Sequence, residues 1–195
     1  MMFKINDLSF SYGKKEVLRN FSLELNDGEI LAVMGASGCG KSTLLQLVAG
    51  LLKPNGGTIE NRPARISYAF QEPRLFPWLT VKENLAAVLP KEVSPQEREE
   101  KILAALSTVE LEDSANLYPD ALSGGMKSRV SLARALVYGG DLFLLDEPFA
   151  ALDESLRLRL GARLRQEIKS RGAMALLVTH HPEDAGRIAD RIITL

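Results

Sequence analysis

Glycine, lysine and serine residues at fixed spacing form a loop suited to holding phosphate groups. Residues 35–42 read Gly-Ala-Ser-Gly-Cys-Gly-Lys-Ser, which fits the pattern G-x-x-x-x-G-K-[ST] at every fixed position. The glycines let backbone N–H groups approach an anion without Cβ clashes, Lys41 reaches the β- and γ-phosphates, and the Ser42 hydroxyl ligates Mg²⁺. We therefore predict that this loop binds ATP or GTP, through Gly35, Ala36, Ser37, Gly38, Cys39, Gly40, Lys41, Ser42 and Thr43.

The segments on either side of this loop match a strand and a helix. Residues 30–34 are short and apolar, as a buried parallel strand is, and residues 43–49 have a helical pattern that Gly50 closes. A strand, a glycine turn and a helix N-terminus surround one anion with N–H groups and the positive helix end. A plain flexible turn is the alternative, and these flanks disfavour it.

A pair of carboxylates follows another apolar run. Asp146 and Glu147 stand at the end of residues 142–145, which we predict to be a buried strand that Pro148 terminates. The carboxyl ends of such strands are where α/β folds place their ligands. Asp146 would hold Mg²⁺ in its outer shell, and Glu147 would orient and deprotonate an attacking water. The alternative is a solvated strand end that happens to carry two acids.

A second glycine pair opens a later helix. Ser123 suits an N-cap, and Gly124 and Gly125 leave N–H groups bare at the start of a helix predicted over residues 126–136. Ser-Gly-Gly before a helix is most often only a cap. Beside a phosphate loop, however, it predicts a second phosphate-binding end, which would close on nucleotide held by another copy of the protein.

Composition and charge restrict the class of protein. The 195 residues are 46% hydrophobic and 25% charged with a net charge of −1, as in a soluble globular protein, and no nucleic-acid partner is expected. The apolar runs are too short to span a bilayer. The one cysteine, Cys39, excludes an internal disulfide and predicts a reducing, cytosolic compartment.

The order of predicted elements gives an α/β core with a helical insert. Strands at 3–5, 8–12 and 21–25 are predicted to form an antiparallel hairpin region. Two further strands, at 58–60 and 65–70, are predicted to pair with each other. Residues 78–118 show only helical patterns and turns, including a capping box at Ser94–Glu97 and an apolar face of Ile102, Leu103, Leu106 and Val109. A strand, a helix striped by Leu156, Leu160, Leu164 and Ile168, and another strand at 173–178 follow.

The motifs, taken in order, resemble those of the ATP-binding subunit of an ABC transporter over nearly the whole chain. The resemblance implies that Tyr12 stacks on adenine with Val17 beside it, and that Gln71 senses Mg²⁺ and the attacking water. Residues 122–126, Leu-Ser-Gly-Gly-Met, resemble the family signature, and Asp153 lies in a loop that crosses a dimer interface. His180 resembles the switch histidine that contacts γ-phosphate. The alternatives are that Tyr12 packs on the core and that His180 is a packed core histidine.

The resemblance also implies the fold, the cofactors and the roles of the site residues. We expect one domain over 1–195, with a P-loop NTPase (RecA-like) core and an N-terminal antiparallel β subdomain in 1–74 and 139–195, and an inserted α-helical subdomain in 75–138. The cofactors are ATP and Mg²⁺. The implied metal ligands are Ser42, Gln71 and Asp146, and the implied catalytic residues are Glu147, His180, Gln71 and Lys41.

Details of the motifs indicate a subgroup and partners. Residues 70–84 and Met126 are similar to importer subunits for nitrate, sulfonates and taurine, which predicts small-solute import. Residues 74–78 would accept a coupling helix of a membrane permease, or pack only between subdomains. The implied partners are a second copy, the permease and, indirectly, a solute-binding protein, at the inner face of the cell membrane.

Departures from the family pattern are also visible. His181 replaces the usual aspartate after the switch histidine, where we expect a changed loop polarity and no loss of hydrolysis. The sequence ends as a final strand is completed at residues 190–195, where many relatives continue, and we expect no regulator-binding segment and a weaker dimer.

Other functional classes stay open. A soluble ABC-type ATPase with a non-transport role would usually carry two cassettes or coiled-coil arms. A P-loop kinase would need no signature helix, and a GTPase should show an Asn-Lys-x-Asp motif, which the sequence lacks.

Overall fold

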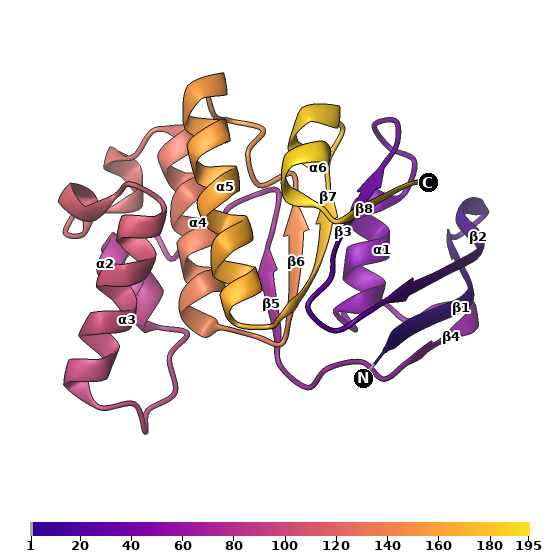
Figure 1. The fold of residues 1–195 in the computed structure, drawn as a ribbon, viewed down its shortest axis with the longest axis horizontal. Coiled ribbons are helices and arrows are strands. Elements are labelled where there is room, and N and C mark those ends of the chain that lie inside the picture. Colours follow the sequence, from indigo (N-terminus) through magenta and orange to yellow (C-terminus); the bar gives the residue numbers. More distant parts are fainter. Residues whose placement is uncertain (1) are drawn as a thin grey trace.

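The computed structural model describes residues 2–195, which form two sheets flanked by helices (Figure 1). The first sheet is antiparallel, in the order β2-β1-β4. It consists of β1 (Phe3–Tyr12), β2 (Lys15–Leu25) and β4 (Gly56–Glu60). The predicted strands at 3–5 and 8–12 are one irregular strand, β1, whose pairing with β2 shifts register after Ile5, after Leu8 and after Phe10. The predicted antiparallel hairpin is therefore confirmed.

The second sheet is parallel and has the order β5-β6-β7-β3-β8. Its strands are β3 (Ile30–Met34), β5 (Ile66–Ala69), β6 (Leu142–Asp146), β7 (Met174–Val178) and β8 (Arg191–Thr194). Every residue of β6 and β7 is buried, which explains their continuous apolar sequence. Because all the strands run the same way, the segments that follow β3, β5, β6 and β7 meet at one edge of the sheet.

One predicted strand pairing is wrong. Residues 58–60 and 65–70 do not pair with each other, because β4 joins β1 and β5 joins β6. The side chains explain this separation. Asn6 donates to the Glu60 carboxylate across the β1–β4 edge at 2.9 Å, whereas Ser67 is buried and donates to Ala135 O at 2.9 Å. The short connection between β4 and β5 therefore carries the chain from one sheet to the other.

Helices cover the two faces of the parallel sheet. They are α1 (Lys41–Val48), α2 (Val81–Ala86), α3 (Pro95–Thr108), α4 (Gly124–Tyr138), α5 (Glu154–Ser170) and α6 (Pro182–Ile188). Alternate strand residues face opposite sides of the sheet. Ile30, Phe143 and Leu177 pack in a cluster with residues of α2 to α6, while Leu31, Leu144 and Val178 pack with α1 and the antiparallel sheet. The mixed α/β architecture is therefore confirmed.

Two details of the helical region differ from the prediction. Ser94 accepts the Glu97 N–H at 3.2 Å, but the Glu97 carboxylate pairs with Lys101, so only half of the predicted capping box forms. The complete capping box lies at Thr80 and Glu83, at the start of α2. The prediction that Leu103 belongs to the apolar face of α3 is wrong. Leu103 is 48% exposed, because α3 turns Ile102, Ala105 and Leu106 inward.

The predicted subdomain boundaries at 75 and 139 stay predictions. α4 shares one hydrophobic cluster with α2, with α3 and with strands of the parallel sheet. Met1, the first residue of the predicted domain, lies outside the described residues.

Asp190, just before β8, links three elements of the core. Its carboxylate accepts the Ile30 N–H at 2.9 Å, Lys169 Nζ at 2.5 Å and Arg165 at 2.7 Å. Burial alone would raise the pKa of this carboxyl, but the hydrogen bonds from Lys169, the Ile30 N–H and Arg165 lower it to about 2. The charged carboxylate therefore stabilises the contact of α5 with the sheet.

We expect Asp190→Asn to lower the free energy of unfolding by about 1 to 2 kcal/mol at neutral pH, since the carboxylate is partly exposed and each pKa unit corresponds to ~1.4 kcal/mol. The folded-state pKa lies below the unfolded value of about 3.9. This stabilisation is therefore complete above about pH 4 and is lost as the pH falls through about 2. Urea unfolding of the wild-type chain and of Asp190→Asn between pH 7 and pH 3 checks this. The difference between their free energies of unfolding should narrow only in acid.

Glu97→Gln is the matched control, because Glu97 and Lys101 form an exposed pair within α3. This control should change the free energy of unfolding by less than ~0.5 kcal/mol. An equal loss in both variants, or a gap that widens in acid, would contradict the role given to Asp190.

Candidate functional site

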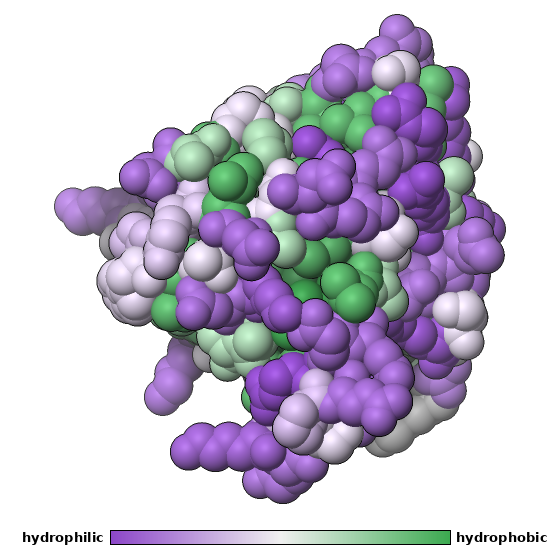
Figure 2. All heavy atoms as spheres, turned by 90° about the vertical axis from the view of Figure 1, so that its left-hand side faces the viewer, coloured by the Kyte–Doolittle hydropathy of each residue, from purple (hydrophilic) through white to green (hydrophobic). Residues whose placement is uncertain are grey.

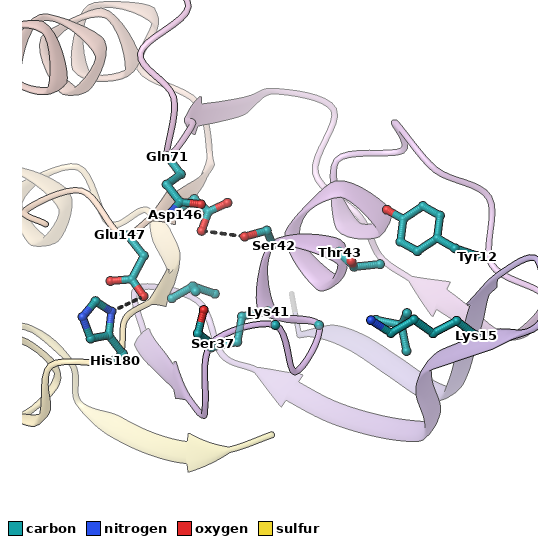
Figure 3. A pocket seen from close by; sticks show the side chains of 14 residues that line it. Tyr12, Lys15, Ser37, Lys41, Ser42, Thr43, Gln71, Asp146, Glu147 and His180 are labelled. Carbon is teal, nitrogen blue, oxygen red and sulfur yellow. Dashed lines mark hydrogen bonds and ion pairs between the residues drawn. The ribbon is translucent and has the colours of Figure 1, made fainter.

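A cavity of about 440 Å³ opens at the sheet edge where the carboxyl ends of β3, β5, β6 and β7 meet (Figure 3). The phosphate loop follows β3, Gln71 follows β5, Asp146 and Glu147 end β6, and His180 follows β7. The cavity is lined by Tyr12, Lys15, Val17, Ser37, Gly38, Gly40, Lys41, Ser42, Thr43, Gln71, Asp146, Glu147, Val178 and His180. Most residues that the sequence singled out therefore lie around one space.

The loop before α1 has the geometry of an anion cradle. Gly38 and Gly40 have φ of 78° and 111°, and no side chain caps the first N–H groups of α1. A Cβ on Gly40 would lie 2.8 Å from Val17 Cγ1, so only glycine lets β2 pack this closely on the loop. Bare N–H groups at a positive helix end favour a phosphate there.

Lys41 is folded back on its own loop. Its Nζ donates to Gly35 O and Ala36 O, both at 2.9 Å, and the side chain is almost completely buried. Gly35 and Ala36 therefore hold the lysine but do not line the cavity. Cys39 does not line the cavity either, and its Sγ packs on Gly35, where an added Cβ would lie 2.8 Å from it. The ammonium group is thus positioned next to the cavity by two carbonyls that a phosphate can replace.

Ser42 and Asp146 connect the two sides of the cavity. Ser42 Oγ donates to Asp146 Oδ1 at 3.0 Å, and Asp146 is 4% exposed. Burial raises the pKa of Asp146, and the hydrogen bond from Ser42 opposes that rise. A cation between the two oxygens would favour the charged carboxylate.

The oxygen donors at this place fit Mg²⁺. Within residues 2–195, no cluster of three or more His, Cys, Asp or Glu side chains could hold a metal by itself. Mg²⁺ is commonly held by one or two carboxylates together with substrate phosphates and water, not by a cage of protein ligands. The hydroxyl and carboxylate of Ser42 and Asp146, with the Gln71 amide in the cavity wall, suit that mode of binding.

Glu147 and His180 face each other at the far wall of the cavity (Figure 3). His180 Nδ1 and Glu147 Oε1 are 2.7 Å apart. Glu147 has a φ of 49°, and its N–H donates to Val178 O, which fixes the carboxylate at the strand end. Its other oxygen, Oε2, is buried and has no hydrogen-bond partner. Glu147 lines the cavity, so its carboxylate is placed to accept a proton from a water molecule there.

The exposure of His180 and of Tyr12 shows whether each is a packed core residue or is open to the cavity. The His180 side chain is 52% exposed, so the alternative of a packed core histidine is wrong. Tyr12 is 51% exposed and meets Phe10 edge-on at a centroid distance of 4.8 Å, while Phe10 itself is buried. Tyr12 is therefore not a core residue, and its stacking on adenine stays a prediction.

The second glycine pair and Asp153 lie outside this cavity. Ser123 accepts the Met126 N–H at 3.3 Å as the N-cap of α4, and Asp153 accepts the Leu156 N–H at 3.0 Å as the N-cap of α5. A Cβ on Gly125 would lie 2.9 Å from Ala151 O, so the start of α4 packs against the loop that carries Asp153. The structure thus brings these two motifs together, at a place apart from the cavity of their own chain.

Two residues of the cavity wall, Lys15 and Val178, were not predicted as site residues from the sequence. For Lys15 a signal was available, because a two-residue turn after Tyr12 places Lys15 directly opposite it in the β1–β2 pair. The structure also adds a contact of His181, whose ring lies 4.0 Å from the His180 ring. Its N–H donates to Thr179 Oγ1 at 3.1 Å. Among the described helices, none is long and apolar enough to cross a membrane.

The chain is similar to a known protein family and to several known proteins. A family model described as "ABC transporter" matches residues 18–150. An aliphatic sulfonates import ATP-binding protein, SsuB, of Corynebacterium glutamicum is 45% identical over 194 residues, which are 98% of this chain and 79% of that protein. A second protein of that name, from Agrobacterium fabrum, is 42% identical and covers 99% of this chain and 70% of its own length.

Solved structures give the same result for the fold. The dimeric structure of MJ0796, a bacterial ABC transporter cassette, superposes with a TM-score of 0.90 at 31% identity, over 99% of this chain and 94% of that one. A dimeric post-hydrolysis state of MJ0796, bound to ADP and Pi, has a TM-score of 0.89 at 32% identity, with the same coverage. At these values the two folds are the same over nearly the whole chain.

Proposed function

Because the chain belongs to the ABC transporter family and is an ATP-hydrolysing motor subunit of that family, we propose that it drives the import of an aliphatic sulfonate. The cargo rests on its relatives, whose names state that they are ATP-binding proteins for import of aliphatic sulfonates. Relatives of that name match nearly the whole length of the chain, so the similarity is not limited to the nucleotide site.

One observation supports the ATPase assignment more than any other. A phosphate cradle, a magnesium-type donor pair and the Glu147 carboxylate line the same cavity. These are the parts that in-line hydrolysis of a γ-phosphate requires, namely a holder, a cation site and a base. In this proposal Lys41 and the N-terminus of α1 hold the phosphates, and Tyr12 and Val17 contact the adenine.

Each residue of the cavity would have a separate role in hydrolysis. The Lys41 ammonium leaves the Gly35 and Ala36 carbonyls and pairs with the β- and γ-phosphates. Mg²⁺, held by Ser42, Asp146 and Gln71, would neutralise charge that develops on the phosphate oxygens. Glu147 orients the attacking water and takes its proton, while His180 contacts the γ-phosphate.

We further propose that a second copy completes the site. Ser123, Gly124 and Gly125 do not line the cavity of their own chain, although they present the open N-terminus of α4. A Cβ on Gly124 would meet nothing within 4 Å, so that end of the helix is free to receive a phosphate. ATP bound between the two copies would bridge them, whereas ADP lacks the bridging phosphate.

The partner that carries the cargo would be a membrane permease, docked on a groove beside the helical region. A groove of about 370 Å³ is lined by Phe70, Arg74, Phe76, Val88 and Tyr138, among others. Trp78 next to it is 70% exposed, and its ring lies 5.7 Å from the Phe76 ring. Figure 2 shows the face of the helical region, where apolar patches lie among hydrophilic side chains.

Docking on this groove would place the chain at the inner face of the cell membrane, in the cytoplasm. A solute-binding protein would act on it only through the permease. Large exposed aromatics beside an apolar groove favour a protein partner at this place over solvent.

Trp78→Ala should release the permease. We expect a tagged wild-type chain, purified from detergent-solubilised membranes of its host, to bring down a multi-span permease, and Trp78→Ala to bring down at least about tenfold less, because buried tryptophans dominate interface energies. Leu103→Ala is the matched control, since Leu103 is an exposed apolar residue on α3. Mass spectrometry identifies the partners.

Recovery of ribosomal or DNA-repair proteins without a permease would contradict the transport role and would favour a soluble ABC-type ATPase. An equal loss of permease with Leu103→Ala would place the docking surface elsewhere.

A further inference from the structure

We propose that Lys15 is a nucleotide-binding residue that pairs with the α-phosphate of the bound nucleotide. This inference rests on the proposed ATP site and adds a residue to it. Lys15 lies in none of the motifs that identify the site, and it reaches the cavity from the β1–β2 hairpin.

The hairpin fixes where Lys15 lies. Tyr12 and Lys15 are directly opposite each other in the antiparallel pair, on either side of the turn at Gly13. Opposite residues in such a pair project from the same face of the sheet. Both side chains line the cavity, and Figure 3 shows Lys15 extending toward the phosphate loop, with Tyr12 as its neighbour.

The position of Lys15 selects one part of the nucleotide. Tyr12 would hold the adenine, and Lys41 with the N-terminus of α1 would hold the β- and γ-phosphates. The ribose and the α-phosphate must lie between these two places. Lys15 stands beside Tyr12 on the side of the cavity away from Glu147 and His180, so its ammonium faces this middle part of the nucleotide.

Lys15 has no competing partner within residues 2–195. Its side chain is exposed, and no hydrogen bond or ion pair joins it to a carboxylate of the described chain. The acidic residues of the cavity, Asp146 and Glu147, are both engaged elsewhere, with Ser42 and His180. An unpaired ammonium on a cavity wall attracts an anion, and its contribution is modest and sensitive to salt because water screens it.

This placement predicts which ligands depend on Lys15. ATP and ADP both carry an α-phosphate and should lose affinity equally when the ammonium is removed. Adenosine carries none and should be unaffected. Lys15 would therefore strengthen nucleotide binding without helping the site to distinguish ATP from ADP, a task left to contacts with the γ-phosphate.

Isothermal titration calorimetry with AMP-PNP, ADP and adenosine tests the proposal. Lys15→Met removes the charge and keeps the aliphatic stem. We expect its Kd for AMP-PNP and for ADP to rise by the same factor, about 2- to 5-fold at low salt and less at high salt. The Kd for adenosine should not change. Lys14→Met is the matched control, because Lys14 is on the same turn, is exposed and does not line the cavity.

Several results would overturn the proposal. An unchanged Kd of Lys15→Met for both nucleotides would do so, as would an equal loss for adenosine, which would mean that the hairpin had been distorted. The same rise in Kd in Lys14→Met would mean that the effect comes from the positive charge of the turn in general and not from a contact of Lys15. If the wild-type chain bound neither nucleotide, the ATP site itself would be wrong, and the inference about Lys15 would fail with it.

Discussion

Glu147→Gln should bind ATP normally and hydrolyse it at least about 100-fold more slowly, because positioned general bases contribute about 10²- to 10⁴-fold to rate. The amide keeps the shape of the side chain but cannot take a proton from water. With hydrolysis blocked, ATP should accumulate between two copies and hold them together. Light scattering at saturating ATP and Mg²⁺ should then show a stable dimer, and a phosphate-release assay should show the loss of turnover.

Glu183→Gln is the control for this variant. Glu183 is an exposed acid on α6, three residues after His180, and it does not line the cavity. Its turnover should equal that of the wild-type chain. If Glu147→Gln remained monomeric at saturating ATP, the shared-site model would be wrong for the isolated chain; if it kept normal turnover, Glu147 would not be the base.

Lys41→Ala should lose most of its affinity for nucleotide. The ammonium is buried and is held by two carbonyls next to the phosphate position, so its removal leaves the charge of the β- and γ-phosphates uncompensated. Truncating one partner of a buried charge pair costs about 2 to 5 kcal/mol, and every ~1.4 kcal/mol is tenfold in Kd. We therefore expect a Kd for AMP-PNP that is about 30-fold higher or more, measured by calorimetry.

Lys53→Ala provides the comparison, because Lys53 is an exposed lysine that follows α1 and does not line the cavity. It should bind AMP-PNP as the wild-type chain does. ATPase activity of Lys41→Ala at the wild-type rate would contradict the assignment of the phosphate loop.

The elements that surround the cavity could be predicted from the sequence because each has a local signal. β6 and β7 are continuous apolar runs, and Gly40 before Lys41 predicts the sharp turn into α1. These signals depend on neighbouring residues alone. The architecture follows from them, because parallel strands joined by helices bring their carboxyl ends to one edge.

Features that depend on contacts between distant residues could not be predicted in the same way. Residues 58–60 and 65–70 both have the pattern of short strands, but only packing decides that the first joins β1 and the second joins β6. Leu103 fits the apolar period of α3 and is still exposed, since the width of the buried face depends on which elements cover the helix. Local patterns predict that an element exists, and tertiary contacts select its partner.

The same distinction applies to the site. Lys41, Asp146 and Glu147 stand in fixed motifs and were predicted, whereas Lys15 reaches the cavity only because the β1–β2 hairpin places it opposite Tyr12. The ring contact between His181 and His180 also became visible only in the structure. The roles of Ser123 and Asp153 stay predictions, since a second copy would complete them.

We propose that ATP hydrolysis by this chain powers transport through a permease. The most direct test is the ATPase rate of the chain alone and of its complex with the copurified permease in nanodiscs, with and without the solute-binding protein loaded with ethanesulfonate. We predict that the rate of the complex depends on the loaded binding protein and that Glu147→Gln abolishes the stimulated rate. An ATPase rate that is the same with and without the permease, and that does not respond to the loaded binding protein, would contradict a role of this chain in driving transport.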